Sequence, residues 1–303
     1  MMRRASGAAA RRGREVAVLG LAGGLLLAPV LKAAPCPEAD LETLWRASKV
    51  AQHRAPEPAE VARSQALFER EFASVALPTA QEWAEAGFTL LSGCADGHHL
   101  RVLRDAQDAG QGFYVFNPTP RRNVVIQAPH RDSDLRSGEI ALRLFVEGGL
   151  RAGAWNTVHR RGPERQSLDT DLAHVQRSHF QALTAALARE APEARLLQLH
   201  GYAQQRRRGA AGRASQLILS AGRREVSAAA ADLHACLVRR FGTQALLYPT
   251  QVQELGGTTN AQSRLLQAQG HGGFLHLELS RPLREELVES PPRRRHLLEC
   301  LDG

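Results

Sequence analysis

The sequence predicts an α/β fold, in which a mixed, largely parallel sheet carries helices on both of its faces. From residue 123 onward, short apolar runs alternate with amphipathic segments, which is the order that repeated strand–helix units produce. The apolar fraction of the 303-residue chain is ordinary for a globular protein, so a sizeable core is possible. Strands that alternate with helices favour parallel pairing, with helices covering both faces.

Residues 35–119 are expected to form an N-terminal extension followed by edge strands. The segment 36–85 looks helical and polar, and Pro56 and Pro58 interrupt it. Short strands are expected at 87–93, 98–104 and 112–116, with Asp and Gly between them. These strands could form a meander on one edge of the sheet.

Residues 120–303 are expected to form the core that carries the function. Its expected strands are 124–127, 152–158, 196–199, 216–219, 245–248 and 274–279. Its expected helices are 137–146, 171–191, 228–241 and 282–289. We expect Ser137 to cap the first helix and Gly148 to end it. The basic tail 293–295 is expected to be solvated surface. The segment 204–213 is also expected to be a solvated loop, with the alternative that Arg206, Arg207 and Arg208 bind an acidic substrate.

The first 34 residues have the layout of a secretory signal peptide. A positive stretch reaches Arg14, an apolar stretch covers 16–31, and the small residues Ala33 and Ala34 follow. The apolar stretch is short for a membrane span, and an uncleaved anchor is the alternative. We therefore expect an exported protein, periplasmic or extracellular, with no stable membrane insertion after the leader is cleaved.

Charge and cysteine usage agree with an exported protein and argue against a nucleic-acid-binding one. The leader contributes +5 of the formal net charge of +8, and no basic stripe with interleaved aromatics follows it, so we expect no nucleic-acid partner. In an oxidising compartment, Cys36 could pair with Cys94 and Cys236 with Cys300; free buried thiols are the alternative. The chain contains no CxxC, which argues against a structural zinc site.

Two histidines and a glutamate stand in or at the ends of apolar runs. His130 follows the run 124–129, His200 ends the run 194–199, and Glu278 interrupts the run 273–279. Buried polar groups are costly unless something pairs with them, and open α/β sheets bind ligands at the carboxyl ends of their strands. The pattern predicts a metal-dependent hydrolase.

An acidic residue in the loop after His130 would complete the metal site. Asp134 is the best-placed partner, while Asp132 and Glu139 remain alternatives. With His200 these residues supply three ligands and leave a fourth position open, as in catalytic zinc sites. The local alternative is a histidine that only caps a strand end by hydrogen bonding.

Glu278 is the expected general base. Burial of a carboxylate within a strand raises its pKa, which suits proton transfer near neutral pH. The alternative is a structural ion pair with Arg281 or Arg284. The sequence has no Gly-x-Ser-x-Gly elbow, His-Glu-x-x-His helix or phosphate-binding loop that would offer a rival chemistry.

Four further residues are candidates for substrate binding. Arg160 follows a predicted strand and could hold a substrate carboxylate. Asp171 and His174, with Ser178, would share one side of the predicted helix 171–191, where they could orient a ligand or simply cap and solvate the helix. Asn260 ends the polar loop 256–260, which could be a mobile lid or a plain surface loop.

The ordered set of these residues resembles the zinc-carboxypeptidase-like amidohydrolases, notably poly-gamma-glutamate hydrolases and N-formylglutamate amidohydrolases. The resemblance covers roughly residues 120 to 290. It rests on three stretches: Ala128-Pro129-His130 with Asp134, Ser137 and Glu139-Ile140; Leu199-His200-Gly201; and Leu277-Glu278-Leu279.

This resemblance implies one catalytic zinc, bound by His130, His200 and Asp134, with Glu278 as the late catalytic glutamate. The sequence departs from carboxypeptidases at position 133, where His-x-x-Glu would need Glu and this chain has Ser. No Asn-Arg pair of the kind that carboxypeptidases use for a terminal carboxylate is evident. The implied substrate is therefore a glutamyl-type or cell-wall peptide or an N-acyl amino acid, cleaved at an amide bond.

Two other functions remain open at this point. The chain could be a periplasmic binding or structural protein that keeps the fold without the chemistry, as the departure at position 133 suggests. It could also be a metal-dependent esterase or deacetylase that uses the same site.

Overall fold

The computed structural model describes residues 39–162 and 169–302. The predicted signal peptide and Cys36 lie outside the described residues, and both remain predictions. Within the described part of the chain, no helix is long and apolar enough to span a membrane.

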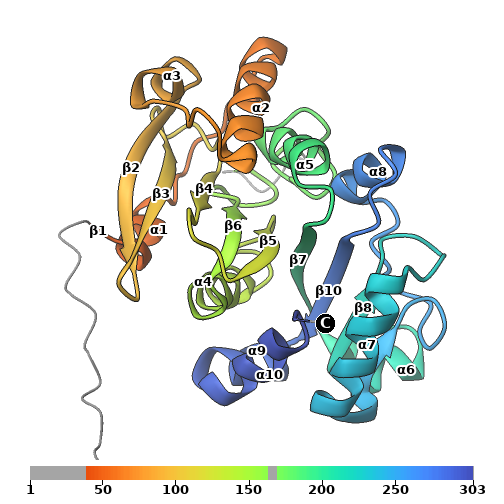
Figure 1. The fold of residues 1–303 in the computed structure, drawn as a ribbon. Helices are drawn as coiled ribbons and strands as arrows, with labels where there is room; N and C mark the ends of the chain where they lie inside the picture. Colours follow the sequence, from red (N-terminus) through yellow and green to blue (C-terminus); the bar gives the residue numbers. More distant parts are fainter. Residues whose placement is uncertain (1–38, 163–168, 303) are drawn as a thin grey trace, which may run out of the picture. The chain divides into compact units, whose positions relative to one another are not determined.

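The described strands form one sheet in the order β1-β2-β3-β4-β6-β5-β7-β10-β8-β9 (Figure 1). Their bounds are β1 Ala39–Asp40, β2 Phe88–Ala95, β3 His98–Asp105, β4 Phe113–Phe116, β5 Arg122–Ala128, β6 Leu150–Trp155, β7 Arg195–Tyr202, β8 Leu217–Ser220, β9 Ala245–Leu247 and β10 Phe274–Ser280. The central strands β6, β5, β7 and β10 are mutually parallel, whereas β2, β3 and β4 form an antiparallel meander beside them. The predicted mixed, largely parallel α/β sheet is confirmed.

Helices cover both faces of this sheet. Their bounds are α1 Leu41–Ala47, α2 Pro58–Ala73, α3 Ala80–Glu85, α4 Ser137–Gly148, α5 His179–Glu190, α6 Ala210–Ala214, α7 Ala228–Phe241, α8 Ala261–Ala268, α9 Arg281–Glu289 and α10 Pro291–Glu299. Apolar side chains of α1, α4, α7, α9 and α10 pack with one face of the strands. Those of α2, α3, α5 and α8 pack with the other face.

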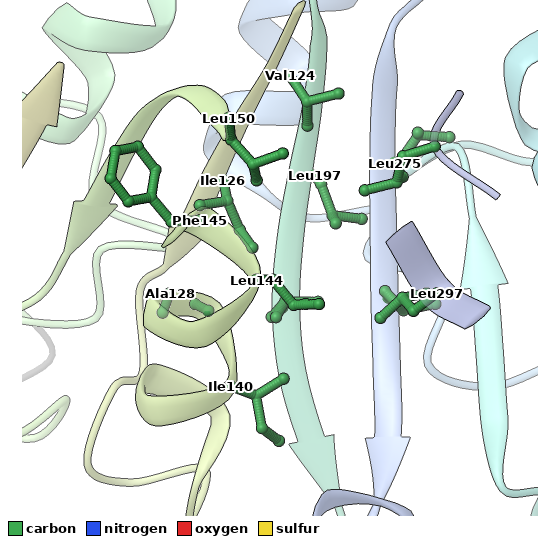
Figure 2. Close-up of a cluster of buried hydrophobic side chains, with 14 of the residues drawn as sticks. Val124, Ile126, Ala128, Ile140, Leu144, Phe145, Leu150, Leu197, Leu275 and Leu297 are labelled. Carbon is green, nitrogen blue, oxygen red and sulfur yellow. The ribbon is translucent and has the colours of Figure 1, made fainter. Parts of the chain in front are cut away.

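The two apolar layers follow from the alternation of side chains along each central strand. In β5, Val124 and Ile126 point into the layer of α4, where Figure 2 shows them with Leu144 and Leu197. Val125 between them points into the opposite layer. Because successive side chains of a strand face opposite sides of the sheet, an apolar strand must be covered by other elements on both faces.

The predicted helix 171–191 is wrong over its first turns. Helix α5 begins at His179, and Ser178 is its N-cap, because its hydroxyl accepts a hydrogen bond from the Gln181 N–H. Before this cap the chain runs through turns, in which Asp171 and His174 make contacts across the sheet edge. Spacing on a helix therefore does not explain why these two residues lie together.

The predicted start of α4 is also corrected. Its N-cap is Arg136, which has a left-handed φ of 74°, and Ser137 is the first helical residue. The Ser137 hydroxyl is buried without a hydrogen-bond partner in the described part of the chain, so it caps nothing. The predicted end is close: α4 ends at Gly148, and Gly149 caps it in the left-handed conformation.

The basic tail expected to be solvated surface is partly buried, and the N-terminal extension packs on the core. The tail 293–295 lies in α10, where Arg294 is 3% exposed and forms an ion pair with Glu147. The segment 36–85 contributes Phe68, Phe72 and Trp83 to the core, because α2 and α3 turn these side chains toward the sheet. In these two polar segments, Arg294 and the aromatic side chains are thus the residues that face the interior.

The Cys236–Cys300 disulfide is confirmed, and it joins α7 to the end of α10. Cys94 is also disulfide-bonded. Its predicted partner Cys36 lies outside the described residues, so that pairing stays a prediction.

Candidate metal centre

The carboxyl ends of three neighbouring parallel strands bring the predicted site residues together. His130 lies two residues beyond the end of β5. His200 lies two residues before the end of β7, and Glu278 lies two residues before the end of β10. Glu278 and His200 are register partners in the ladder between β10 and β7. Since these strands are parallel and adjacent, all three side chains reach the same edge of the sheet.

Asp134 is placed by a tight turn after His130. The N–H groups of Ser133 and Asp134 both donate to the His130 carbonyl, so the chain makes one helical turn. This turn brings Asp134 Oδ2 to 3.1 Å from His130 Nδ1 and 3.3 Å from His200 Nδ1. The two Nδ1 atoms are themselves 3.1 Å apart.

These three atoms have the spacing of ligands around one small cation. Metal bonds of about 2.0–2.2 Å in a tetrahedral site place neighbouring ligand atoms roughly 3.3–3.6 Å apart. The observed distances of 3.1, 3.1 and 3.3 Å lie at or slightly below this edge length. His130, Asp134 and His200 therefore form a candidate metal site.

The outer nitrogen of each histidine is held by an acceptor. His130 Nε2 lies 2.7 Å from Asp171 Oδ1, and His200 Nε2 lies 2.8 Å from Gln198 Oε1. Neutral rings that donate through Nε2 present a bare lone pair at Nδ1. Two such lone pairs and a carboxylate oxygen converge here, and they repel one another unless a cation or proton lies between them.

The orientation of Gln198 follows from a buried amide network. Gln198 Nε2 donates to Gln127 Oε1 at 3.0 Å and to Gln262 Oε1 at 3.1 Å. Gln198 Oε1 accepts from Asn260 as well as from His200. With both amide hydrogens occupied on one side, only the carbonyl oxygen can face His200.

The charges of the metal-free site favour a positive charge between these groups. Burial disfavours the imidazolium of His130, but hydrogen bonds to Asp134 and Asp171 outweigh it and raise the His130 pKa to about 9. Burial likewise opposes ionisation of Asp134, yet contacts with His130 and His200 hold its pKa well below the usual range. A proton therefore takes the place in which a metal ion would fit.

Glu278 differs from every other acid near this site. Burial, and secondarily the charge of Asp134, raises the Glu278 pKa to about 8. Its Oε2 atom has no hydrogen-bond partner among the described residues, although the side chain is only 10% exposed. Within the same residues it forms no ion pair with Arg281, which binds Glu285, or with Arg284, which binds backbone carbonyls.

His276 is a site residue that the sequence reasoning missed. It precedes Glu278 by two positions in β10 and therefore faces the same side of the sheet. Its ring lies against His200 at a centroid distance of 4.6 Å, and its Nε2 is 3.9 Å from Glu278 Oε1. The available signal was the i, i+2 spacing of His276 and Glu278 within one buried strand.

The predicted substrate-binding residues take different places. Asp171 is directly behind His130 and also binds Arg160 and His174, at 2.7 and 3.1 Å. Arg160 remains about one third exposed at the cleft, and His174 about half. Asn260 is 2% exposed and donates to Gln198, so it lies behind His200.

The alternative acidic ligands lie away from the histidines. Asp132 forms an ion pair with Lys49, and Glu139 forms ion pairs with Arg136 and Arg143 along α4. Of the three acids that the sequence offered, Asp134 alone contacts both histidines.

A cleft of about 800 Å³ opens over the candidate metal centre. Two of its lining side chains are carboxylates, Asp134 and Glu278. Its arginines are more numerous: Arg160, Arg161, Arg206, Arg207, Arg281 and Arg284. Two arginines of the segment 204–213, Arg206 and Arg207, border the cleft, which favours the alternative interpretation of this segment over that of a solvated loop. The cleft is cationic and favours anionic ligands.

Comparison with known proteins gives only distant structural likenesses. No known protein family and no curated protein matches the sequence. The solved structure of gene product Atu2144 from Agrobacterium tumefaciens is 13% identical over 60% of this chain and 90% of its own, with a TM-score of 0.43. A putative carboxypeptidase A from Shewanella denitrificans is 11% identical over 71% and 75%, with a TM-score of 0.36.

An aspartoacylase family protein from Mesorhizobium loti is 14% identical over 71% of this chain and 66% of its own, with a TM-score of 0.36. Likenesses this weak carry no chemistry to the present chain. Its function has to be inferred from its own residues.

Proposed function

We propose that this chain is an exported zinc-dependent amidohydrolase that cleaves an amide bond in an anionic substrate. The observation that carries the proposal is the convergence of His130 Nδ1, His200 Nδ1 and Asp134 Oδ2 within 3.1–3.3 Å of one another. Both rings are held from behind through Nε2, so both Nδ1 atoms face the position in which a metal ion would fit.

The ligand set favours zinc over other common cations. Two imidazole nitrogens and one carboxylate oxygen suit zinc, whereas magnesium and calcium prefer oxygen ligands alone. Three protein ligands leave a fourth position toward the cleft. Zinc held there would supply Lewis acidity, polarising the scissile carbonyl and activating water.

Glu278 is the proposed general base and acid. Its raised pKa matches proton transfer near neutral pH, and the side chain lines the cleft, where its carboxylate would take a proton from the attacking water. The same carboxyl group would then deliver that proton to the leaving amine. His276 lies beside this group, with Nε2 3.9 Å from Glu278 Oε1.

The arginines of the cleft support an acidic substrate. Arg160 is fixed by Asp171 through Nη2 and is one third exposed, so it is oriented before a ligand arrives. Arg161 and Arg206 add positive charge with no ion-pair partner among the described residues. Glutamyl-type peptides, acidic cell-wall peptides and N-acylated acidic amino acids share the required carboxylates. The Cys236–Cys300 disulfide supports the exported location.

Metal analysis of the purified full chain tests the proposal first. A preparation made without chelator should hold about one zinc per chain, and added zinc should raise the melting temperature of the metal-free protein. The double variant His130→Ala/His200→Ala should lose both effects. Absence of zinc binding by the wild-type protein would overturn the proposed function.

A panel of acidic amides, esters and N-acetylated compounds then separates the remaining functions. Amide hydrolysis that depends on Glu278 supports an amidohydrolase. Preference for esters or acetyl groups would point to an esterase or deacetylase, and zinc binding without turnover would point to a binding protein.

A further inference from the structure

Arg284 is a buried cation at the base of the cleft. It lies in α9, directly after the strand that carries Glu278, and is 5% exposed. Among the described residues no carboxylate comes within ion-pair distance of it. Burying a guanidinium without a counter-ion is costly, so its hydrogen bonds must offset the loss of hydration.

The guanidinium of Arg284 binds three backbone carbonyls from three different segments. Nη1 donates to Leu135 O, Nη2 donates to Tyr202 O at 3.2 Å, and Nε donates to Ser280 O at 3.4 Å. These carbonyls are far apart in the sequence but lie around one side chain.

Each of the three carbonyls closely follows a residue of the candidate centre. The first belongs to the residue directly after Asp134. The second belongs to the second residue after His200, and the third to the second residue after Glu278. Arg284 thus connects the three segments that supply the acidic ligand, the second histidine and the proposed base.

Gly201 lets this side chain approach. A Cβ atom at position 201 would lie 2.4 Å from Arg284 Nη1 and 2.5 Å from Cζ, closer than carbon atoms can come. The Gly201 N–H donates to Asp134 Oδ2 at 3.2 Å. The same glycine therefore touches the guanidinium on one side and a ligand atom on the other.

We infer that Arg284 is a positioning residue, which sets the spacing of Asp134, His200 and Glu278 by holding the backbone that follows each of them. This inference rests on the proposed function for its consequence in metal binding. Only a planar group with five donors reaches three carbonyls from one position. Lysine keeps the charge but cannot bridge all three, so Arg284→Lys isolates the geometric contribution.

Arg294 supplies a matched control. It is 3% exposed, lies in the next helix and also donates to two backbone carbonyls, those of Leu287 and Val288. Its partners are distant from the candidate centre. Arg294→Lys should therefore lower the melting temperature without changing the centre.

The first measurement is zinc affinity by chelator competition, with kcat and KM on the same preparations. Arg284→Lys should weaken zinc binding ~10–100-fold, the scale for residues that support metal ligands from behind. Arg294→Lys should bind zinc as the wild-type protein does. Equal losses in the two variants, or wild-type affinity in Arg284→Lys, would overturn the inference.

A second measurement needs no metal and separates this inference from the proposed function. In the metal-free protein, hydrogen exchange of the Gly201 amide should be at least ~10-fold faster in Arg284→Lys, relative to the Leu197 amide in the same strand. The same ratio should not change in Arg294→Lys. If the wild-type chain bound no zinc, the proposed function would be wrong. The ratio of the Gly201 and Leu197 exchange rates would still decide whether Arg284 holds the backbone of the centre.

The variant Gly201→Ala provides a second test of the inference if Arg284→Lys does not fold. It keeps the arginine but displaces it, and should reproduce the loss of zinc affinity. Gly272→Ala is the control, because a Cβ atom at that position meets nothing within 4 Å. Wild-type affinity in Gly201→Ala would contradict the inference.

Discussion

Two regions of this protein bury histidine and carboxylate side chains, and they treat them in opposite ways. In the contact between α2 and α5, His179 Nδ1 lies 2.7 Å from Ser64 Oγ. Glu71 in the same layer accepts from Arg101 and from the indole of Trp83. Each of these groups has a partner of complementary charge or hydrogen-bonding capacity.

At the carboxyl ends of β5, β7 and β10 the buried groups are only partly satisfied. The two histidine rings are held from behind by Asp171 and Gln198. Their Nδ1 atoms face one another and Asp134 Oδ2, and Glu278 Oε2 has no hydrogen-bond partner among the described residues. The first region shows what a stable polar core looks like in this chain. The contrast indicates that the second region is arranged for something that is added to it, since unpaired buried groups cost stability.

The largest contrast is expected between the two buried glutamates. Glu278→Gln should lower kcat by ~10²–10⁴-fold while zinc stays bound and the fold stays intact. Glu71→Gln should leave kcat nearly unchanged but destabilise the protein by about 2 kcal/mol, because Arg101 and Trp83 lose a charged acceptor. Turnover and melting temperature measured on both variants make the comparison. Unchanged turnover in Glu278→Gln would remove that residue from the mechanism.

The acids around His130 give the next contrast. Asp134→Ala should weaken zinc binding by more than the ~10–100-fold typical of a supporting residue. Asp132→Ala and Glu139→Ala should leave it close to wild type, because their carboxylates bind Lys49 and two arginines of α4. Isothermal titration of metal-free protein measures all three. Loss of zinc binding in Glu139→Ala alone would show that the acidic ligand is misassigned.

A smaller difference in zinc affinity is expected between variants of the two residues that hold His200 and His179. Gln198→Leu removes the acceptor of His200 Nε2 and should weaken zinc binding ~10–100-fold. Ser64→Ala removes the partner of His179 and should not affect zinc at all. If both variants bound zinc equally well, the tautomer of His200 would not depend on the amide network.

These contrasts also show what the sequence can and cannot predict. The sheet, most strand positions and the set His130, Asp134, His200 and Glu278 are predicted by apolar runs and by the polar residues at their ends. Those signals work because parallel neighbours end at one edge of a sheet.

The support behind these residues is not predictable in the same way. Gln198 and Arg284 act through contacts with segments 60 or more residues away, as in the bond from Gln198 to Gln262 and that from Arg284 to Leu135. The local spacing of Asp171 and His174 also gave a wrong prediction, because it suggested that both residues lie on one face of a helix. Asp171 instead lies in a turn, and its carboxylate is fixed by His130 and Arg160.

The last contrast lies wholly within the contact of α2 and α5 and concerns stability alone. Burial lowers the His179 pKa to about 4 in the folded chain. Between about pH 6.5 and pH 4, His179 is therefore protonated in the unfolded chain but not in the folded chain. Stability should therefore fall as the pH drops from about 6.5 to 4, by up to about 3 kcal/mol. His179→Gln should flatten this part of the melting-temperature profile, whereas the exposed His98→Gln should not. An unchanged slope in His179→Gln would place the acid sensitivity elsewhere.

The contact of Arg131 with the first described helix has a practical consequence for dividing this chain. Arg131 follows His130, stacks on the Trp45 ring at 3.9 Å, and donates to Trp45 O and Ser48 Oγ. Strand β4 pairs with β6 across the same boundary. A fragment that began at residue 120 would lose the anchor of the loop that carries His130 and Asp134, and it would expose an unpaired strand edge prone to aggregation. The N-terminal segment is thus a working part of the centre, to be kept whenever the protein is shortened, fused or redesigned.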